Sequence, residues 1–98
     1  MSYELIKSTH FTRKASKIIK SNPKLKDTIL KTLQLLSDDP FASPLRTHKL
    51  KGQLEGSYAC SINYEYRIIF KVFSEFELGF NNNKIIFLET IGTHDEVY

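Results

Sequence analysis

In the first third of the chain, apolar side chains recur at the three- and four-residue spacing of a helix face. The repeat is interrupted at Asn22-Pro23, where proline suits the first turn of a new helix because its missing N–H has no partner there. The pattern therefore predicts two helices, over 11–19 and 25–36. Their apolar stripes consist of Phe11, Ala15, Ile18 and Ile19, and of Leu25, Ile29, Leu33 and Leu36.

The second half of the chain changes to a two-residue alternation and to β-branched and aromatic side chains, both typical of strands. In its first predicted strand, Tyr58 and Cys60 point to one face of the sheet, and Ala59 and Ser61 point to the other. A short apolar run at the N-terminus also predicts a strand. The predicted strands are 3–7, 58–65, 67–73 and 84–91, with loops over the basic segment 40–56 and around Gly79 and 81–83.

The order β-α-α-β-β-β predicts an α+β fold in which consecutive strands pair as an antiparallel meander. The two helices form a hairpin that covers one face of a twisted, mainly antiparallel sheet. The other face of the sheet stays open. Ser61, Asn63 and Arg67 are predicted to lie on this open face, where a substrate or a partner can reach them.

The length of 98 residues fits a single domain over residues 1–98 and excludes an enzyme with a separate cofactor domain. The only cysteine, Cys60, has no partner for an internal disulfide and is too few for a zinc site, so neither a metal nor a cofactor is expected. Cys60 is predicted to be a small buried side chain. No apolar run approaches the roughly 20 residues of a membrane span, and the N-terminus lacks the features of a secretion signal. We therefore expect a cytoplasmic protein without a membrane contact.

Charge is distributed unevenly along the chain. Residues 1–56 carry 11 basic and 5 acidic side chains, whereas residues 57–98 carry 3 basic and 6 acidic ones. A basic surface attracts polyanions such as nucleic acid at long range. The alternative interpretation is an ordinary solvated helix surface.

The sequence contains no phosphate-binding glycine loop, no paired metal-ligand spacing and no nucleophile elbow. The candidate reactive groups are two histidines and an arginine. His48 lies in the basic loop and His94 near the end of the chain, and each is compatible with an ordinary surface role. Arg67 either forms a cross-strand ion pair with Glu65 or another acid, or it is a phosphate ligand, because its forked guanidinium matches two phosphate oxygens.

Three segments of the chain resemble the RelE/ParE superfamily of bacterial toxins. They are 48–56 (HKLKGQLEG), 66–72 (YRIIFKV) and 91–98 (IGTHDEVY). The resemblance is strongest to the YafQ-like branch of RelE messenger-RNA interferases, and the length and order of elements fit as well. The ending Gly-Thr-His-x-x-x-aromatic is its most specific part. The resemblance implies the two-layer RelE-like fold over essentially the whole chain.

The resemblance also implies a function, that of the toxin of a type II toxin–antitoxin system. Such a toxin is a metal-independent, ribosome-dependent endoribonuclease that cleaves messenger RNA in the ribosomal A site and so inhibits translation. A cognate antitoxin protein neutralises it, and operator DNA is bound only through the toxin–antitoxin complex.

The family's functional positions carry over to this sequence residue by residue. The catalytic set is His94, Arg67, His48 and Glu65. In this set His94 is the general acid or base, Arg67 holds the scissile phosphate, and His48 makes a second contact. Glu65 either orients a histidine or acts as a base. The expected RNA-binding set is Tyr98, Arg46, Lys49 and Lys51.

Four positions depart from the YafQ-like pattern. Ser61 stands where these enzymes have a histidine, and Ala59 replaces a nearby acid. Thr90 takes the place of an arginine, and Tyr66 that of a tryptophan. These departures leave open which residues carry out the proton transfers. They also leave open that the chain is an inactive relative that only binds its antitoxin. The other alternative is a ParE-like inhibitor of DNA gyrase, although members of that branch generally lack the paired histidines.

Overall fold

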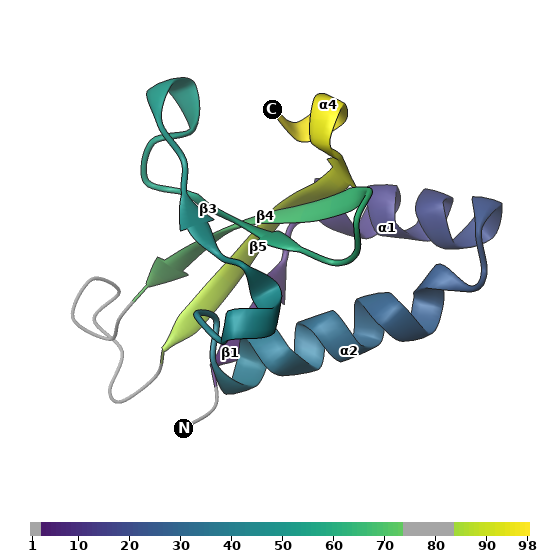
Figure 1. The fold of residues 1–98 in the computed structure, drawn as a ribbon, viewed down its shortest axis with the longest axis horizontal. Coiled ribbons are helices and arrows are strands. Elements are labelled where there is room, and N and C mark those ends of the chain that lie inside the picture. The colour runs from purple at the N-terminus through teal and green to yellow at the C-terminus, as the bar shows by residue number, and fades with distance from the viewer. Residues whose placement is uncertain (1–2, 74–83) are drawn as a thin grey trace.

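A β-sheet lies at the centre of the computed structural model, which describes residues 3–73 and 84–98 (Figure 1). Within these residues the sheet has five strands in the order β1-β5-β4-β3-β2. The loop predicted around Gly79 and 81–83 lies outside the described residues. Along the chain, the elements are β1 (Glu4–Lys7), α1 (Thr9–Ser21), α2 (Leu25–Asp38), the 3₁₀ turn η1 (Ser43–Leu45), β2 (His48–Lys49), the 3₁₀ turn η2 (Gly52–Leu54), β3 (Tyr58–Ser61), β4 (Tyr66–Phe73), β5 (Ile85–Thr93) and α4 (His94–Val97).

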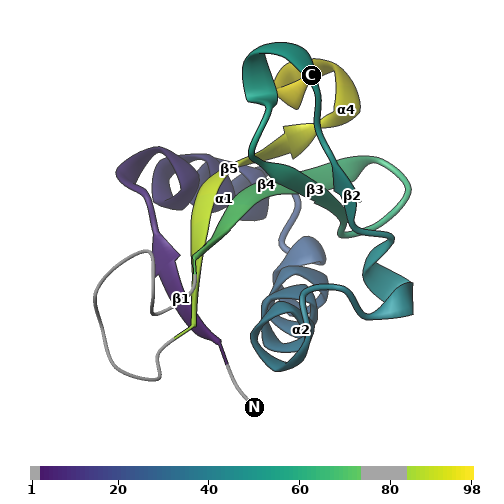
Figure 2. The same cartoon turned by 90° about the vertical axis from the view of Figure 1, so that its left-hand side faces the viewer.

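The strand connections confirm the predicted α+β class and the mainly antiparallel sheet. Strands β2, β3, β4 and β5 form an antiparallel meander. Strand β1 pairs in parallel with β5. The two helices and the strands β2, β3 and β4 lie between β1 and β5 along the chain. Figure 2 shows the start of β1 and α4 at opposite ends of this arrangement.

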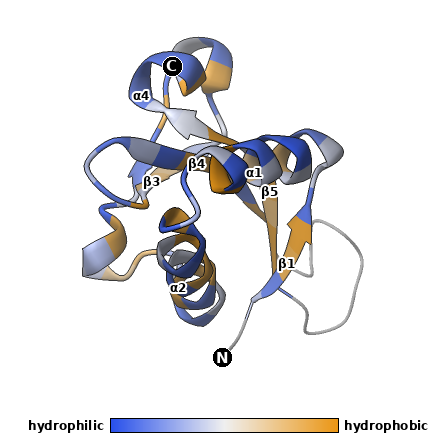
Figure 3. Ribbon diagram, turned by 90° about the vertical axis from the view of Figure 1, so that its right-hand side faces the viewer, coloured by the Kyte–Doolittle hydropathy of each residue, from blue (hydrophilic) through white to orange (hydrophobic). Residues whose placement is uncertain are grey.

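Both predicted helices are present, and each is longer than its apolar stripe. The hydroxyl of Ser8 accepts a hydrogen bond from the N–H of Phe11 at 2.9 Å and so caps α1. Helix α2 begins at Leu25, two residues after Pro23, and the N–H of Asp39 closes its last turn on the carbonyl of Leu35 at 2.8 Å. Both helices carry hydrophilic as well as hydrophobic residues (Figure 3). No helix in the described part of the chain is long and apolar enough to cross a membrane.

The main core lies between the helices and one face of the sheet. Its fully buried side chains include Phe11 and Leu36 from the helices, and Phe70 and Leu88 from β4 and β5. Cys60 belongs to the same core, as predicted, and burial raises the pKa of its thiol to about 12. The thiol is therefore protonated and shielded at neutral pH.

The opposite face of the sheet is less open than predicted. A row of paired residues runs across it from His48 through Ala59 and Ile69 to Thr90. Ala59 and Ile69 are buried although they do not belong to the main core. Tyr98, which follows α4, reaches the His48 end of this row with its hydroxyl.

Three predicted boundaries are wrong. The segment 40–56 is not a continuous loop, because it contains β2 and two 3₁₀ turns. The strand predicted over 58–65 ends at Ser61, where the backbone turns toward β4. Strand β5 continues to Thr93 instead of ending at Ile91, and the residues after it form the helical turn α4. All three errors fall at chain reversals, where the apolar pattern carries little information.

Candidate functional site

The guanidinium of Arg67 is held by the turn that joins β3 to β4. Its Nη1 donates to the carbonyl oxygens of Asn63 at 2.8 Å, Tyr66 at 3.0 Å and Tyr64 at 3.2 Å. No ion pair joins Arg67 to Glu65 in the described part of the chain. These contacts use one nitrogen, and within residues 3–73 and 84–98 no other protein group accepts a hydrogen bond from the rest of the fork, which suits it to binding an anion.

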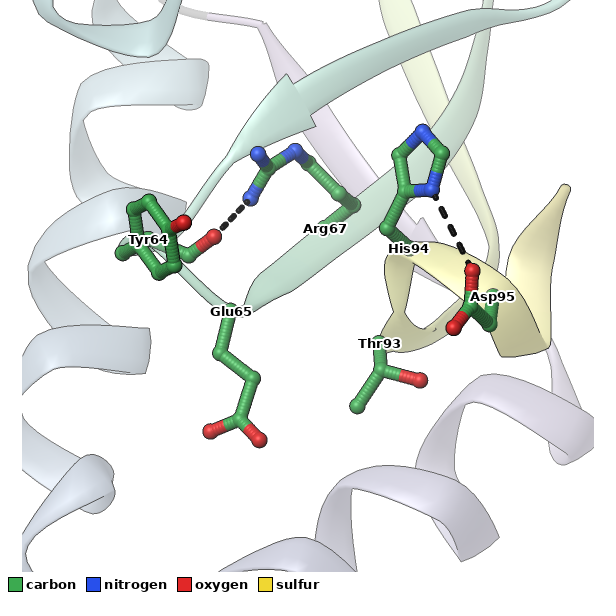
Figure 4. A pocket seen from close by; sticks show the side chains of 6 residues that line it. All are labelled: Tyr64, Glu65, Arg67, Thr93, His94 and Asp95. Carbon is green, nitrogen blue, oxygen red and sulfur yellow. Dashed lines mark hydrogen bonds and ion pairs between the residues drawn. The ribbon is translucent and has the colours of Figure 1, made fainter.

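Arg67 and His94 line the same open cleft, which has a volume of about 480 Å³. The turn between β3 and β4 forms one wall, and the start of α4 forms the other. The imidazole stands across from the guanidinium, whereas the carboxylate of Glu65 points away from both (Figure 4). The lining residues are Tyr64, Glu65, Arg67, Thr93, His94 and Asp95.

Tyr98 connects the two histidines. Its ring centroid lies 4.4 Å from that of His94 in an edge-to-face arrangement, and its hydroxyl lies 3.3 Å from Nε2 of His48. Partial burial raises the pKa of the Tyr98 hydroxyl, although nearby Arg67 acts in the opposite direction. The hydroxyl therefore keeps its proton and can donate it in a hydrogen bond.

The contacts of His48 define its tautomer. Its Nδ1 lies 3.2 Å from the carbonyl oxygen of Arg46. Because a carbonyl only accepts, Nδ1 carries the proton in the neutral ring, and Nε2 accepts from the hydroxyl of Tyr98. Arg46 itself has a positive φ of 53°, a conformation that is uncommon for a residue with a side chain. The backbone of Arg46 thus orients His48, a role that the sequence did not suggest.

A network at the end of β5 positions α4 and hence His94. The hydroxyl of Thr93 accepts from the N–H of Glu96, whose carboxylate accepts from the N–H of Thr93 at 2.9 Å, forming a capping box. The same carboxylate forms an ion pair of 2.8 Å with Lys14 on α1. Lys14 and the Thr93 contacts lower the pKa of Glu96 to about 2. A side chain at Gly92 would come within 3.2 Å of Glu96, so glycine lets α4 lie close against β5.

The predicted RNA-binding lysines lie outside the cleft of Arg67 and His94. Lys49 and Lys51 line a second hollow of about 450 Å³ on the β2–β3 hairpin. A hydrogen bond of 2.6 Å from the hydroxyl of Ser57 to the carboxylate of Glu89 ties this hairpin to β5. In both ribbon views, the hairpin and α4 lie at the same end of the sheet (Figures 1 and 2).

Sequence reasoning missed several residues of the site. The pattern Thr-x-x-Glu at 93–96 is a recognisable capping-box signal and could have predicted α4. No sequence signal pairs Lys14 with Glu96 or Ser57 with Glu89, because these residues are far apart in the chain. Within the described residues, no group of three His, Cys, Asp or Glu side chains is placed to hold a metal ion.

The departures from the YafQ-like pattern surround the site. Ser61 pairs with Arg67 across the sheet, so a histidine at position 61 would lie beside the guanidinium. Thr90 and Ala59 flank the buried Ile69, and Tyr66 pairs with Thr93 at the base of α4.

The fold is similar to those of several solved toxins. The crystal structure of YafQ from E. coli strain BL21(DE3) superposes with a TM-score of 0.76 at 16% sequence identity, covering 98% of each chain. The YoeB/ParE toxin from Agrobacterium tumefaciens has a TM-score of 0.74 at 16% identity, covering 93% of this chain and 98% of that one. The crystal structure of the E. coli DinJ-YafQ toxin-antitoxin complex also has a TM-score of 0.74 at 16% identity, covering 100% of this chain and 99% of that one.

No family model matches the sequence, and no curated protein matches it. The resemblance to the RelE/ParE superfamily is nevertheless confirmed at the level of the fold, over nearly the whole chain.

Proposed function

We propose that this chain, as one domain over residues 1–98, is the toxin of a type II toxin–antitoxin system and cleaves messenger RNA on the ribosome. The observation that carries the proposal is the cleft that Arg67 and His94 share on a fold similar to that of YafQ. An anion-binding guanidinium opposite an exposed imidazole suits attack on a phosphodiester.

RNA cleavage by this route makes three chemical demands. The 2′-hydroxyl loses a proton as it attacks the adjacent phosphate, negative charge develops on the phosphorane, and the departing 5′-oxygen gains a proton. Histidine suits proton transfer near neutral pH, and each such transfer contributes about 10²- to 10⁴-fold to a rate. A fixed guanidinium stabilises the developing charge.

These demands assign roles to the residues of the site. The free nitrogens of Arg67 hold the scissile phosphate, and His94 exchanges a proton with the reacting oxygens. His48 makes a second proton-transfer or phosphate contact, and Tyr98 orients the substrate base while it connects the two imidazoles. Glu65 ranks below them, because its carboxylate points away from the cleft in the structure (Figure 4).

The proposed toxin has an antitoxin and RNA as its partners. A cognate antitoxin neutralises it, as suggested by the similarity to the DinJ-YafQ toxin-antitoxin complex. Operator DNA is bound only through that complex, and the toxin works in the cytoplasm without a metal or another cofactor. The basic surface with Arg46, Lys49 and Lys51 contacts RNA beyond the cleft.

A second candidate function is inhibition of DNA gyrase, which is supported by the structural similarity to the YoeB/ParE toxin from Agrobacterium tumefaciens. The two histidines joined through Tyr98 favour the nuclease, because gyrase inhibition requires no proton transfer. An inactive relative that only binds its antitoxin is the third candidate, and the serine at position 61 is its main support.

Induction of the protein in cells, followed by mapping of transcript 5′ ends, separates these candidates. We expect cuts phased with codons, and their loss on co-expression with the antitoxin. Intact transcripts with DNA damage would indicate gyrase inhibition. Intact transcripts and undamaged DNA in cells that accumulate the folded protein would indicate the inactive relative.

A further inference from the structure

Tyr64 is the most exposed of the large hydrophobic side chains described, with 98% of its surface accessible. The neighbouring tyrosines differ from it. Tyr58 and Tyr66 are half-buried and pack against the main core. Tyr98 is 44% exposed and contacts both histidines. Burial of this ring contributes little to folding, so both of its faces are free to contact a ligand.

The backbone that carries Tyr64 is well fixed. The side-chain oxygen of Asn63 accepts hydrogen bonds from the N–H groups of Glu65 at 2.9 Å and Tyr66 at 2.8 Å. Arg67 donates to the carbonyl of Tyr64 itself at 3.2 Å. The exposed ring is thus attached to a turn whose backbone is fixed by hydrogen bonds to the side chain of Asn63 and to the guanidinium of Arg67.

The ring lies at the edge of the candidate catalytic cleft. Tyr64, Arg67 and His94 all line it, and the guanidinium lies between the phenol ring and the imidazole (Figure 4). A phosphate held by Arg67 therefore places one flanking nucleotide next to the ring of Tyr64. An exposed aromatic face beside a phosphate site is suited to stacking on an unpaired base.

We propose that Tyr64 is a stacking platform for a nucleobase next to the scissile phosphate and thereby a residue that positions the substrate. This inference rests on the proposed ribonuclease function. RNA is favoured over a protein partner because the turn fixes Tyr64 relative to the guanidinium that binds the phosphate. Stacking accepts every base, so the ring orients the nucleotide and leaves hydrogen-bond discrimination to other groups.

The test compares Tyr64→Ala, Tyr64→Phe and Tyr64→Trp in steady-state cleavage on programmed ribosomes. Loss of one stacked base corresponds to about a 5- to 150-fold fall in kcat/KM, which we expect for Tyr64→Ala. Tyr64→Phe and Tyr64→Trp should keep most of the wild-type kcat/KM, because stacking requires the aromatic face and not the hydroxyl. Leu30→Ala, which removes a 52% exposed apolar side chain from α2, serves as the control and should cleave at the wild-type rate. Melting temperatures exclude unfolding.

A second readout does not depend on cleavage. An oligoribonucleotide with 2′-O-methyl groups cannot be cut, and it should shift the ring resonances of Tyr64 in an NMR titration. If the protein cuts no RNA but the resonances shift, the proposed cleavage fails, and what stands is Tyr64 as a contact for bound RNA. Wild-type cleavage by Tyr64→Ala would overturn the platform. So would loss of antitoxin binding by a Tyr64→Ala variant that still cleaves, since the ring would then belong to a protein interface.

Discussion

On one face of β4, Ile68 and Phe70 are fully buried beneath the helices, whereas Arg67 on the other face is held by the carbonyl groups of a turn. The helix-covered face is apolar and closed. The opposite face carries Arg67 on β4 itself, and the two histidines lie on short segments that contribute no buried residue to the main core. Helix α4, for example, has no buried residue of its own. The main core therefore lies on one face of the sheet, and the chemistry that we propose for Arg67 and His94 lies on the other.

This separation has a consequence for mutations. A change on the covered face should remove the fold and every activity together. A change on the opposite face should remove activity and leave the fold intact. Changes on the covered face act through the hydrophobic effect, because they alter buried apolar side chains. Changes on the opposite face act on the polar groups that line the cleft.

The largest effect is expected on the covered face. Phe70→Ala should destabilise the protein by about 3–5 kcal/mol, because it leaves a cavity in place of a fully buried ring. This is a large part of the stability of a small domain. Thermal unfolding measures the loss, and alkylation of Cys60 reports it independently, since its buried thiol with a pKa of about 12 should react only when the core opens. A Phe70→Ala variant with the wild-type melting temperature would contradict the assignment of the core.

Arg67→Ala should have the next largest effect and only on activity. Loss of a charge-stabilising donor lowers a catalytic rate by about 10²- to 10³-fold. Arg67→Lys is the matched control: it keeps the charge but loses the fork, so it should retain part of the activity. Both variants should keep Cys60 unreactive and bind the antitoxin. Exposure of Cys60 in folded Arg67→Ala would mean that the two faces are not independent.

The smallest effect is expected for the contact that joins the two sides. Lys14→Met removes the ion pair with Glu96, and a surface pair of this kind corresponds to a fivefold change at most. Lys20→Met on the same helix removes an equal charge that has no ion pair in the described residues, so it controls for long-range effects. We expect a cleavage rate a few times lower for Lys14→Met than for Lys20→Met, with the same melting temperature.

The pKa of Glu96 offers a sharper measurement of the same contact. Its folded pKa of about 2 lies below the ordinary 4.5, so its stabilisation of α4 is fully present above pH 4.5 and is lost as the pH falls toward 2. In Lys14→Met the pKa should rise toward 4.5, because Lys14 is the largest cause of the shift. An unchanged pKa in an NMR titration would show that the ion pair does not form in solution.

The sequence predicted the covered face better than the opposite face. Apolar periodicity identified both helices and placed residues such as Phe11 and Leu36 in the core, because burial leaves a regular pattern. The cleft depends on chain reversals and on contacts between distant residues, such as Tyr98 with His48. The family resemblance supplied Arg67 and His94, which the structure brings together, and also Lys49 and Lys51, which it places in another hollow. The alternation predicted Tyr64 inside the strand 58–65, and no sequence signal indicated the turn that exposes its ring.

The most direct test of the central claim is the cleavage rate of purified His94→Gln on programmed ribosomes, measured beside the wild type. Glutamine keeps the polar character of the exposed side chain but cannot act as an acid or a base near neutral pH. We predict a rate about 10²- to 10⁴-fold lower than that of the wild type, with an unchanged melting temperature and intact antitoxin binding. A folded His94→Gln protein that cuts messenger RNA at the wild-type rate would contradict the account of this face as the catalytic one.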